Sequence, residues 1–78
     1  MIVKRLGSEE PIVIIANSAD YISDIKQKIY QARPTDEMEP VYQSLIWAGK
    51  GLEDGRQLSD YGITNTSPFF LVLRRPAG

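Results

Sequence analysis

The segment from residue 18 to residue 32 limits the fold more than any other part of this chain, because it alone carries a clear helical pattern. Ile22, Ile25 and Ile29 recur at spacings of three and four residues. On a helix this spacing places the three side chains in one apolar stripe, which must be buried against another element. The pattern therefore predicts a single amphipathic helix that packs on a sheet.

The ends of this helix are marked by polar residues and by proline. Ser18 or Asp20 can act as the N-cap, and Pro34 disfavours helical geometry at the residue before it. We therefore expect the helix to end near residue 31 or 32. Asp24 and Lys28 lie four residues apart, in the favourable order for a weak ion pair on the outer face.

Apolar runs with the length of strands lie on both sides of the helix. The expected strands are residues 2–6, 12–16, 43–47, a brief one near 51–52, and 69–73. Glycine and proline between the first two runs predict a hairpin, and Asp54-Gly55 predicts a turn. Residues 58–61 should form one helical turn. The order ββαββ indicates the α+β class, with a mixed sheet packed on one α-helix.

Length and composition exclude several kinds of chemistry. A chain of 78 residues forms one small domain, which buries only about 60% of the surface of its unfolded state. We expect residues 1–73 to form this domain and residues 74–78 to form a flexible C-terminal tail. The absence of cysteine and histidine excludes disulfides, thiolate zinc sites, thiol nucleophiles and imidazole bases. The acidic residues near 36–39 and 53–54 have no partner base or nucleophile, so we expect no enzyme, no cofactor and no metal site.

Charge and hydropathy limit the partners and the location. A net charge of −1 gives no basis for binding nucleic acid, which requires clustered positive charge. The start of the chain has no signal pattern, and no run approaches the roughly 18 apolar residues of a membrane span. We therefore expect a soluble protein of the cytoplasm, the nucleus or both, with no nucleic-acid or membrane partner.

Residues 45–63, with the sequence LIWAGKGLEDGRQLSDYGI, point to a known family. This run is similar to the matching segment of ubiquitin at every position except Trp47, Gly51, Gln57 and Gly62. A match this dense over so long a run is more specific than any short motif. The chain resembles the ubiquitin family, which implies the β-grasp fold, with the last strand central in the sheet and parallel to the first.

The resemblance also implies a function, which is to be recognised by other proteins rather than to catalyse. The positions that correspond to the main partner-binding patch of ubiquitin, with its basic rim, are Leu6, Ile46, Gly49, Lys50, Phe70 and Val72. Phe70 stands where ubiquitin has histidine, and Ser44 stands where it has arginine. Both differences change the surface that a partner would meet.

The alternation of side chains along a strand tests whether this patch faces solvent or the core. If Leu45 and Trp47 pack on the helix, Ile46 must point to the other face of the sheet. By the same alternation Phe70 and Val72 point away from the helix. The alternative is that these side chains belong to the core.

A second apolar surface is expected on the strand from residue 12 to residue 16. If its other residues face the core, Val13 and Ile15 face water on an edge strand, and exposed apolar edges favour pairing with another chain. We expect a monomer with weak self-association through these two residues. A shifted register, or cover by the loop around Met38, would remove this surface.

Lysines and the tail bear on covalent conjugation. On the resemblance, four lysines match lysine positions of ubiquitin, namely Lys4, Lys26, Lys28 and Lys50. Lys50 is the candidate chain acceptor, although it can also be a simple solvated rim residue. Gly78 and Arg74 match tail residues that conjugation uses. Ala77 adds a methyl where ubiquitin has a bare glycine backbone, and Pro76 fixes φ and removes an N–H that an extended tail would use, so activation should be impaired.

Two functions remain open at the level of sequence. In the first, the chain is a ubiquitin-like protein or domain of the ubiquitin and proteasome pathway. It would bind ubiquitin-binding domains, proteasome components or ligase components without a covalent bond, in a signalling role. In the second, it is a modifier joined to lysines through Gly78. Residue 78 can also be an arbitrary boundary within a longer chain.

Overall fold

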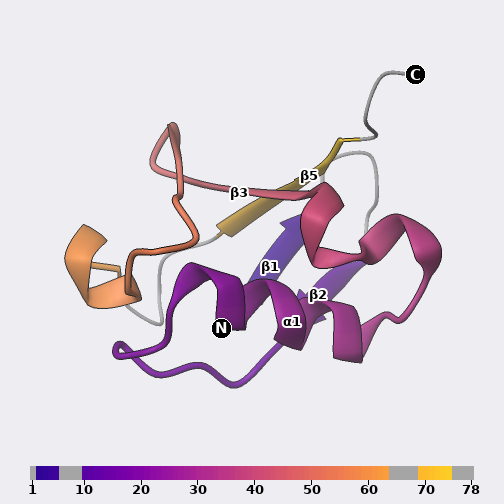
Figure 1. Cartoon of the computed structure of the whole chain (residues 1–78), viewed down its shortest axis with the longest axis horizontal. Helices are drawn as coiled ribbons and strands as arrows, with labels where there is room; N and C mark the ends of the chain where they lie inside the picture. Colours follow the sequence, from indigo (N-terminus) through magenta and orange to yellow (C-terminus); the bar gives the residue numbers. More distant parts are fainter. Residues whose placement is uncertain (1, 6–9, 64–68, 75–78) are drawn as a thin grey trace.

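A five-stranded sheet carries one long α-helix on one of its faces (Figure 1). This computed structural model describes residues 2–5, 10–63 and 69–74. The elements are β1 (Ile2–Arg5), β2 (Pro11–Val13), α1 (Ile22–Ala32), β3 (Gln43–Trp47), β4 (Lys50–Gly51) and β5 (Phe69–Leu73). Short 3₁₀ helices lie between them: η1 (Asp36–Met38), η2 (Pro40–Tyr42) and η3 (Leu58–Tyr61). The predicted order of strands and helix is confirmed.

The sheet is mixed, and its strands follow the order β2-β1-β5-β3-β4. β5 is parallel to β1 and antiparallel to β3, so the last strand lies at the centre between the first strand and the third. A central strand meets side chains on both faces, which accounts for the unbroken apolar run of β5. The expected central, parallel last strand is confirmed.

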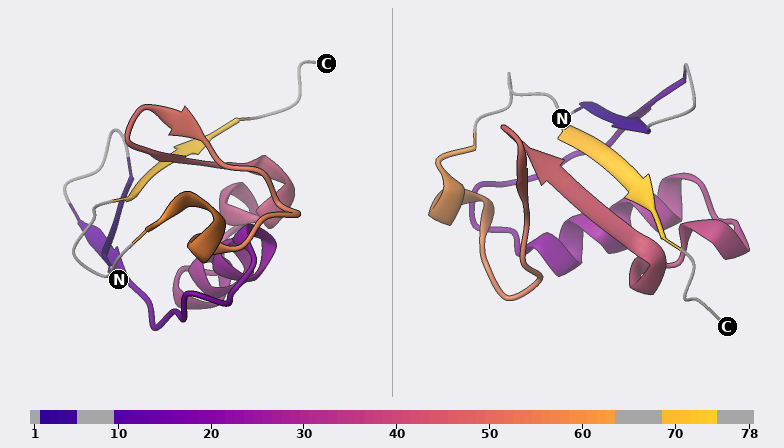
Figure 2. Two further views of the ribbon diagram at one scale, coloured as in Figure 1. Left: turned by 90° about the vertical axis from the view of Figure 1, so that its left-hand side faces the viewer. Right: turned by 90° about the horizontal axis from the view of Figure 1, so that it is seen from above.

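The core lies between this sheet and the apolar stripe of α1. Ile22, Ile25 and Ile29 are fully buried, as the helical spacing predicts. They pack with the inward residues of the sheet, including Val3 and Leu71. The left panel of Figure 2 shows the helix on one side of the strands. No helix among the described residues combines the length and the apolar character that a bilayer span requires.

The second strand is shorter than expected. We expected residues 12–16, whereas β2 ends at Val13. In the register, Val13 lies opposite Ile2, where β1 begins. Ile14 stays buried in the core, but Ile15 continues outside the strand with a largely exposed side chain.

At the start of the helix, the structure differs from two expectations. The N-cap is Tyr21 rather than Ser18 or Asp20, and its backbone N–H donates to the Asp24 carboxylate at 3.0 Å. Asp24 is therefore turned toward the first turn and does not pair with Lys28. The Nζ of Lys28 reaches the Asp20 carboxylate at 2.7 Å and the carbonyl oxygen of Ile15 at 2.8 Å. The helix ends at Ala32, as predicted.

The segment after the helix is more ordered than an acidic loop. It forms η1 and η2, and Met38 inserts into the core with only 2% of its surface exposed. The buried Gln43 amide nitrogen donates to the carbonyl oxygens of Met38 at 2.6 Å and Lys26 at 2.9 Å. These bonds attach the segment to both α1 and β3.

Candidate functional site

A row of residues crosses the face of the sheet that α1 does not cover. Phe70 of β5 lies opposite both Lys4 of β1 and Ile46 of β3, and Ile46 lies opposite Gly51 of β4. Residues opposite each other in neighbouring strands share a face, so this row spans four strands. The right panel of Figure 2 views the sheet from this side, with the helix behind it.

The apolar members of this face are only partly covered. Ile46, Phe70 and Val72 are half-buried, whereas their chain neighbours Leu45 and Leu71 are completely buried. The contrast between adjacent residues follows from side-chain alternation, because one of each pair packs on the helix. Val72 lies opposite Ser44, so these two side chains share a face of the sheet. Ile46, Phe70 and Val72 are called the sheet patch below.

A tight turn positions the edge of this surface. Ala48 and Gly49 connect β3 to β4 with φ values of 52° and 78°. Positive φ at both central residues is typical of two-residue hairpin turns, and glycine adopts it without strain. The turn places the exposed Lys50 opposite Trp47. Sequence reasoning placed Gly49 and Lys50 together with the patch, and the fold puts them at the end of β3 that follows Ile46.

Exposed basic side chains flank the strands that carry the sheet patch, although Lys50, opposite Trp47, shares the face of Trp47 rather than that of Ile46. Lys4 lies beside Phe70, Lys50 follows the turn, and Arg74 comes directly after β5. The backbone N–H of Arg74 donates to the carbonyl oxygen of Tyr42 at 2.7 Å, which fixes the end of the strand. Leu6 and Gly78, which were also named from sequence, lie outside the described residues.

The four lysines that match ubiquitin differ in accessibility. Lys26 is 8% exposed and its Nζ pairs with Asp54, so it is buried beneath the β4–η3 connection. Lys28 is held by Asp20. Lys4 and Lys50 are exposed. The sequence pattern alone could not separate these two classes, because it does not show which faces the neighbouring loops cover.

A second apolar surface lies at the edge of the sheet formed by β2. Val13 is 68% exposed and Ile15 is 87% exposed. Ile2, which lies opposite Val13 in the register, is 48% exposed. Met38 packs in the core, and the loop around it does not cover these side chains. Sequence reasoning missed Ile2, whose signal is its pairing register with Val13. Ile2, Val13 and Ile15 are called the edge cluster below.

Chemically reactive arrangements are scarce in the described part of the chain. No three carboxylates among the described residues gather closely enough to hold a metal ion. A hollow beside Lys50 is lined by two basic and two acidic side chains, together with Gly51 and the half-buried Tyr61. Such an arrangement suits contact with a partner better than it suits proton transfer.

The comparison with protein families agrees with this architecture. The model of the Ubiquitin family matches residues 2–76 of the chain. The match includes the helix and every strand, and therefore also the sheet patch and its basic rim. Together, the mixed sheet on one helix and this family match show that the chain belongs to the ubiquitin family.

Proposed function

We propose that this chain acts by non-covalent protein recognition through the sheet patch, in the ubiquitin and proteasome pathway. The observation that carries the proposal is the pairing of Ile46 with Phe70 on the open face of the sheet, with both side chains half-buried. Proteins that would use this surface are ubiquitin-binding domains, proteasome components or ligase components. The chain would meet them in the cytoplasm or the nucleus.

The chemistry of the surface supports a specific kind of partner. Apolar side chains at the centre supply area that loses water on contact. Lys4, Lys50 and Arg74 at the rim attract acidic groups and orient the partner. A short amphipathic helix with an apolar stripe and flanking carboxylates fits this pattern. Because the apolar area is small, we expect binding in the micromolar to millimolar range.

A nuclear magnetic resonance titration tests the proposal. The ¹⁵N-labelled protein is titrated with a ubiquitin-interacting helix, and amide shifts are mapped onto the strands. We expect the shifts to concentrate in residues 44–51 and 69–74. Ile46→Ala should weaken binding about tenfold, which corresponds to ~1.4 kcal/mol.

Val41→Ala is the matched control, because Val41 is 78% exposed but lies in η2, outside the sheet. It should leave the dissociation constant unchanged. Absence of shifts at millimolar helix, or equal losses in the two variants, would count against the sheet patch as the binding site.

The second candidate is a covalent modifier joined to lysines through Gly78. It is favoured by the exposed Arg74 at the end of β5 and by the two exposed lysines, Lys4 and Lys50. Pro76 and Ala77 oppose it, because a fixed φ and an added methyl hinder a tail that must thread a narrow channel.

A thioester assay separates the two candidates. The protein is mixed with a ubiquitin-activating enzyme and ATP, and the reducible adduct is measured. We expect little or no thioester from the natural sequence and a clear gain from the double variant Pro76→Gly, Ala77→Gly. Efficient thioester formation by the natural sequence would favour the modifier.

A further inference from the structure

One side of Ile46 is left open by the strand beside it. Ile46 lies between two cross-strand neighbours, Phe70 of β5 and Gly51 of β4. Residues opposite each other on neighbouring strands share a face, and their side chains contact one another. Phe70 can therefore cover the β5 side of Ile46, whereas glycine has no side chain that could cover the β4 side. β4 is the outermost strand here, and Gly51 is exposed. The space over Gly51 beside Ile46 is called the slot below.

The fold does not require glycine at this position. Gly49 and Gly62 have φ values of 78° and 69°, which other residues adopt only with strain. Gly51 is not among the glycines with positive φ. A Cβ on Gly51 would meet no described atom within 4 Å outside the neighbouring residues of the chain. Neither the backbone conformation nor the packing therefore explains the glycine.

The glycine also weakens the strand that contains it. Glycine has no side chain to pack, and it loses more conformational freedom on folding than other residues do. β4 has only two residues, so the loss falls on a short strand. Glycine within a strand often marks a place where a ligand or another backbone approaches closely. Because Gly51 adjoins the sheet patch, a close approach by a partner of that patch accounts for it.

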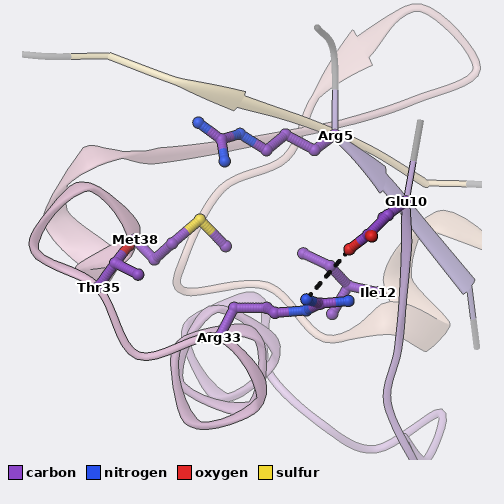
Figure 3. Close-up of a pocket in the computed structure, with 6 residues that line it drawn as sticks. All are labelled: Arg5, Glu10, Ile12, Arg33, Thr35 and Met38. Carbon is purple, nitrogen blue, oxygen red and sulfur yellow. Dashed lines mark ion pairs between the residues drawn. The ribbon is translucent and has the colours of Figure 1, made fainter. Parts of the chain in front are cut away.

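A pocket between the end of β1, the end of α1 and η1 gives a contrast (Figure 3). The side chains drawn around it are those of Arg5, Glu10, Ile12, Arg33, Thr35 and Met38. Arg33 Nη1 and Glu10 Oε2 are 3.4 Å apart, so charged groups of the chain itself meet at this pocket. A ligand there would have to compete with them. The slot arises instead from a missing side chain, so a ligand that enters it displaces water.

We propose that the slot accepts an aromatic side chain from the helix of a partner, and that Gly51 thereby selects among the partners of the sheet patch. This inference rests on the function proposed above for that patch. The ring would lie on the backbone of Gly51 and contact the uncovered side of Ile46. Without a Cβ on residue 51, nothing holds the ring away from the backbone.

An aromatic ring suits the slot better than a branched aliphatic side chain does. The side chains of phenylalanine, tyrosine and tryptophan each bury about 150–250 Å². A flat ring can cover the peptide plane of Gly51 and the side of Ile46 together, whereas leucine would cover less of the glycine backbone. At the edge of the sheet, the polar group of tyrosine or tryptophan can stay in water.

The experiment compares three amphipathic helices, titrated into the ¹⁵N,¹³C-labelled protein. The first has acidic ends and a stripe of leucines, and the other two carry tryptophan in place of the first or the last leucine of the stripe. We expect one tryptophan helix to bind about fivefold more tightly than the leucine helix. The other should gain less, because the slot lies on one side of Ile46. A ring over Gly51 should also move the methyl signals of Ile46 upfield.

Two glycine variants test the slot directly. Gly51→Gln fills it with a side chain that covers Ile46, so the preference for tryptophan should fall below about twofold. Gly51→Ala adds only a methyl and should remove part of the preference. Gly55→Gln is the matched control, because Gly55 is exposed in a turn and a Cβ there would also meet no described atom within 4 Å. It should keep the full preference. Unchanged amide signals away from each substitution show that the variants fold.

Each outcome decides the proposal. Loss of the tryptophan preference in Gly51→Gln but not in Gly55→Gln, with the upfield shift of Ile46, supports it. Binding of all three helices at residues 44–51 and 69–74 without a preference would overturn the slot and leave the sheet patch intact. A preference that survives Gly51→Gln, or that both glutamine variants remove, would also overturn it. Binding of no helix would refute the function proposed for the sheet patch, and the slot with it.

Discussion

The sheet patch and the edge cluster are both apolar, but they occupy different places in the fold. Ile46 and Phe70 lie on neighbouring strands in the middle of the sheet and are half-buried. Val13 and Ile15 lie at the outer edge and are 68% and 87% exposed. Side chains on central strands have neighbours on both sides, which hold them in place before any partner arrives. The more exposed surface is therefore the less organised one.

The edge itself is poorly suited to strand pairing. β2 has only three residues, and its first is Pro11, which has no N–H to donate. Short edge strands and edge prolines are means by which proteins avoid edge-to-edge association. We therefore expect contact through the edge cluster to depend on its side chains and to be weak, whereas the sheet patch presents a prearranged surface to a specific partner.

The largest expected effect separates the two faces of the central strand β5. Leu71 is fully buried and Val72 is half-buried on the opposite face. Leu71→Ala should lower the free energy of unfolding by about 3 kcal/mol, because it opens a cavity in the core. Val72→Ala should lower it by less than about 1 kcal/mol. Urea unfolding measures both variants, and equal losses would show that Val72 is a core residue and would remove it from the sheet patch.

An effect of intermediate size is expected when the contacts of Lys28 that hold the segment bearing Ile15 are weakened. Lys28 Nζ contacts both the Asp20 carboxylate and the carbonyl oxygen of Ile15, so it attaches the segment that carries Ile15 to the helix. The hydrogen bond from Lys28, followed by that from the Asn17 backbone, lowers the pKa of Asp20 from its ordinary value. A lowered pKa stabilises the fold above the pKa of the unfolded state, and this contribution disappears as the pH falls through the folded pKa.

Asp20→Asn should therefore lower the free energy of unfolding by about 1 kcal/mol at neutral pH. The natural protein loses this contribution as the pH falls below the ordinary carboxyl pKa toward the lowered pKa of Asp20, so the difference from the variant should become smaller in acid. Denaturant unfolding at pH 7 and at about pH 3 measures this change. A constant difference across this range would contradict the assigned ion pair.

A smaller effect is expected on self-association. The double variant Val13→Asp, Ile15→Asp places like charges on the edge cluster and should weaken association at millimolar concentration about threefold or more. Ile46→Ala serves as the control and should leave self-association unchanged. Sedimentation or diffusion measurements over a concentration series give both constants. If Ile46→Ala reduces association instead, the sheet patch is the contact between copies.

The sequence predicted those features of the fold that hydrophobic periodicity or family resemblance determines. Ile22, Ile25 and Ile29 specified the buried stripe, and alternation specified which of Leu71 and Val72 enters the core. The central position of β5 in the sheet was expected from the resemblance to the ubiquitin family, because no local sequence pattern specifies the order of strands.

Contacts between distant segments could not be predicted in this way. The pairing of Lys28 with Asp20 depends on how the chain returns to the helix after Ile15. The pocket between Arg5 and Arg33 arises only when β1, α1 and η1 meet. These side chains are ordinary charged residues in the sequence, and only their three-dimensional arrangement makes them notable.

The smallest expected effect is the absence of a pH response at the sheet patch. Phe70 occupies the central position of the patch, and the chain contains no histidine. Without histidine, this surface lacks the side chain whose charge ordinarily changes between about pH 6 and pH 7. Affinity for a helix that itself lacks histidine should therefore stay constant over this range. Phe70→His would restore a titratable group beside Lys4, and its binding should then weaken as the pH falls, because a second positive charge would enter the apolar centre. If the natural protein already shows such a decline, the partner contacts a titrating group outside the sheet patch.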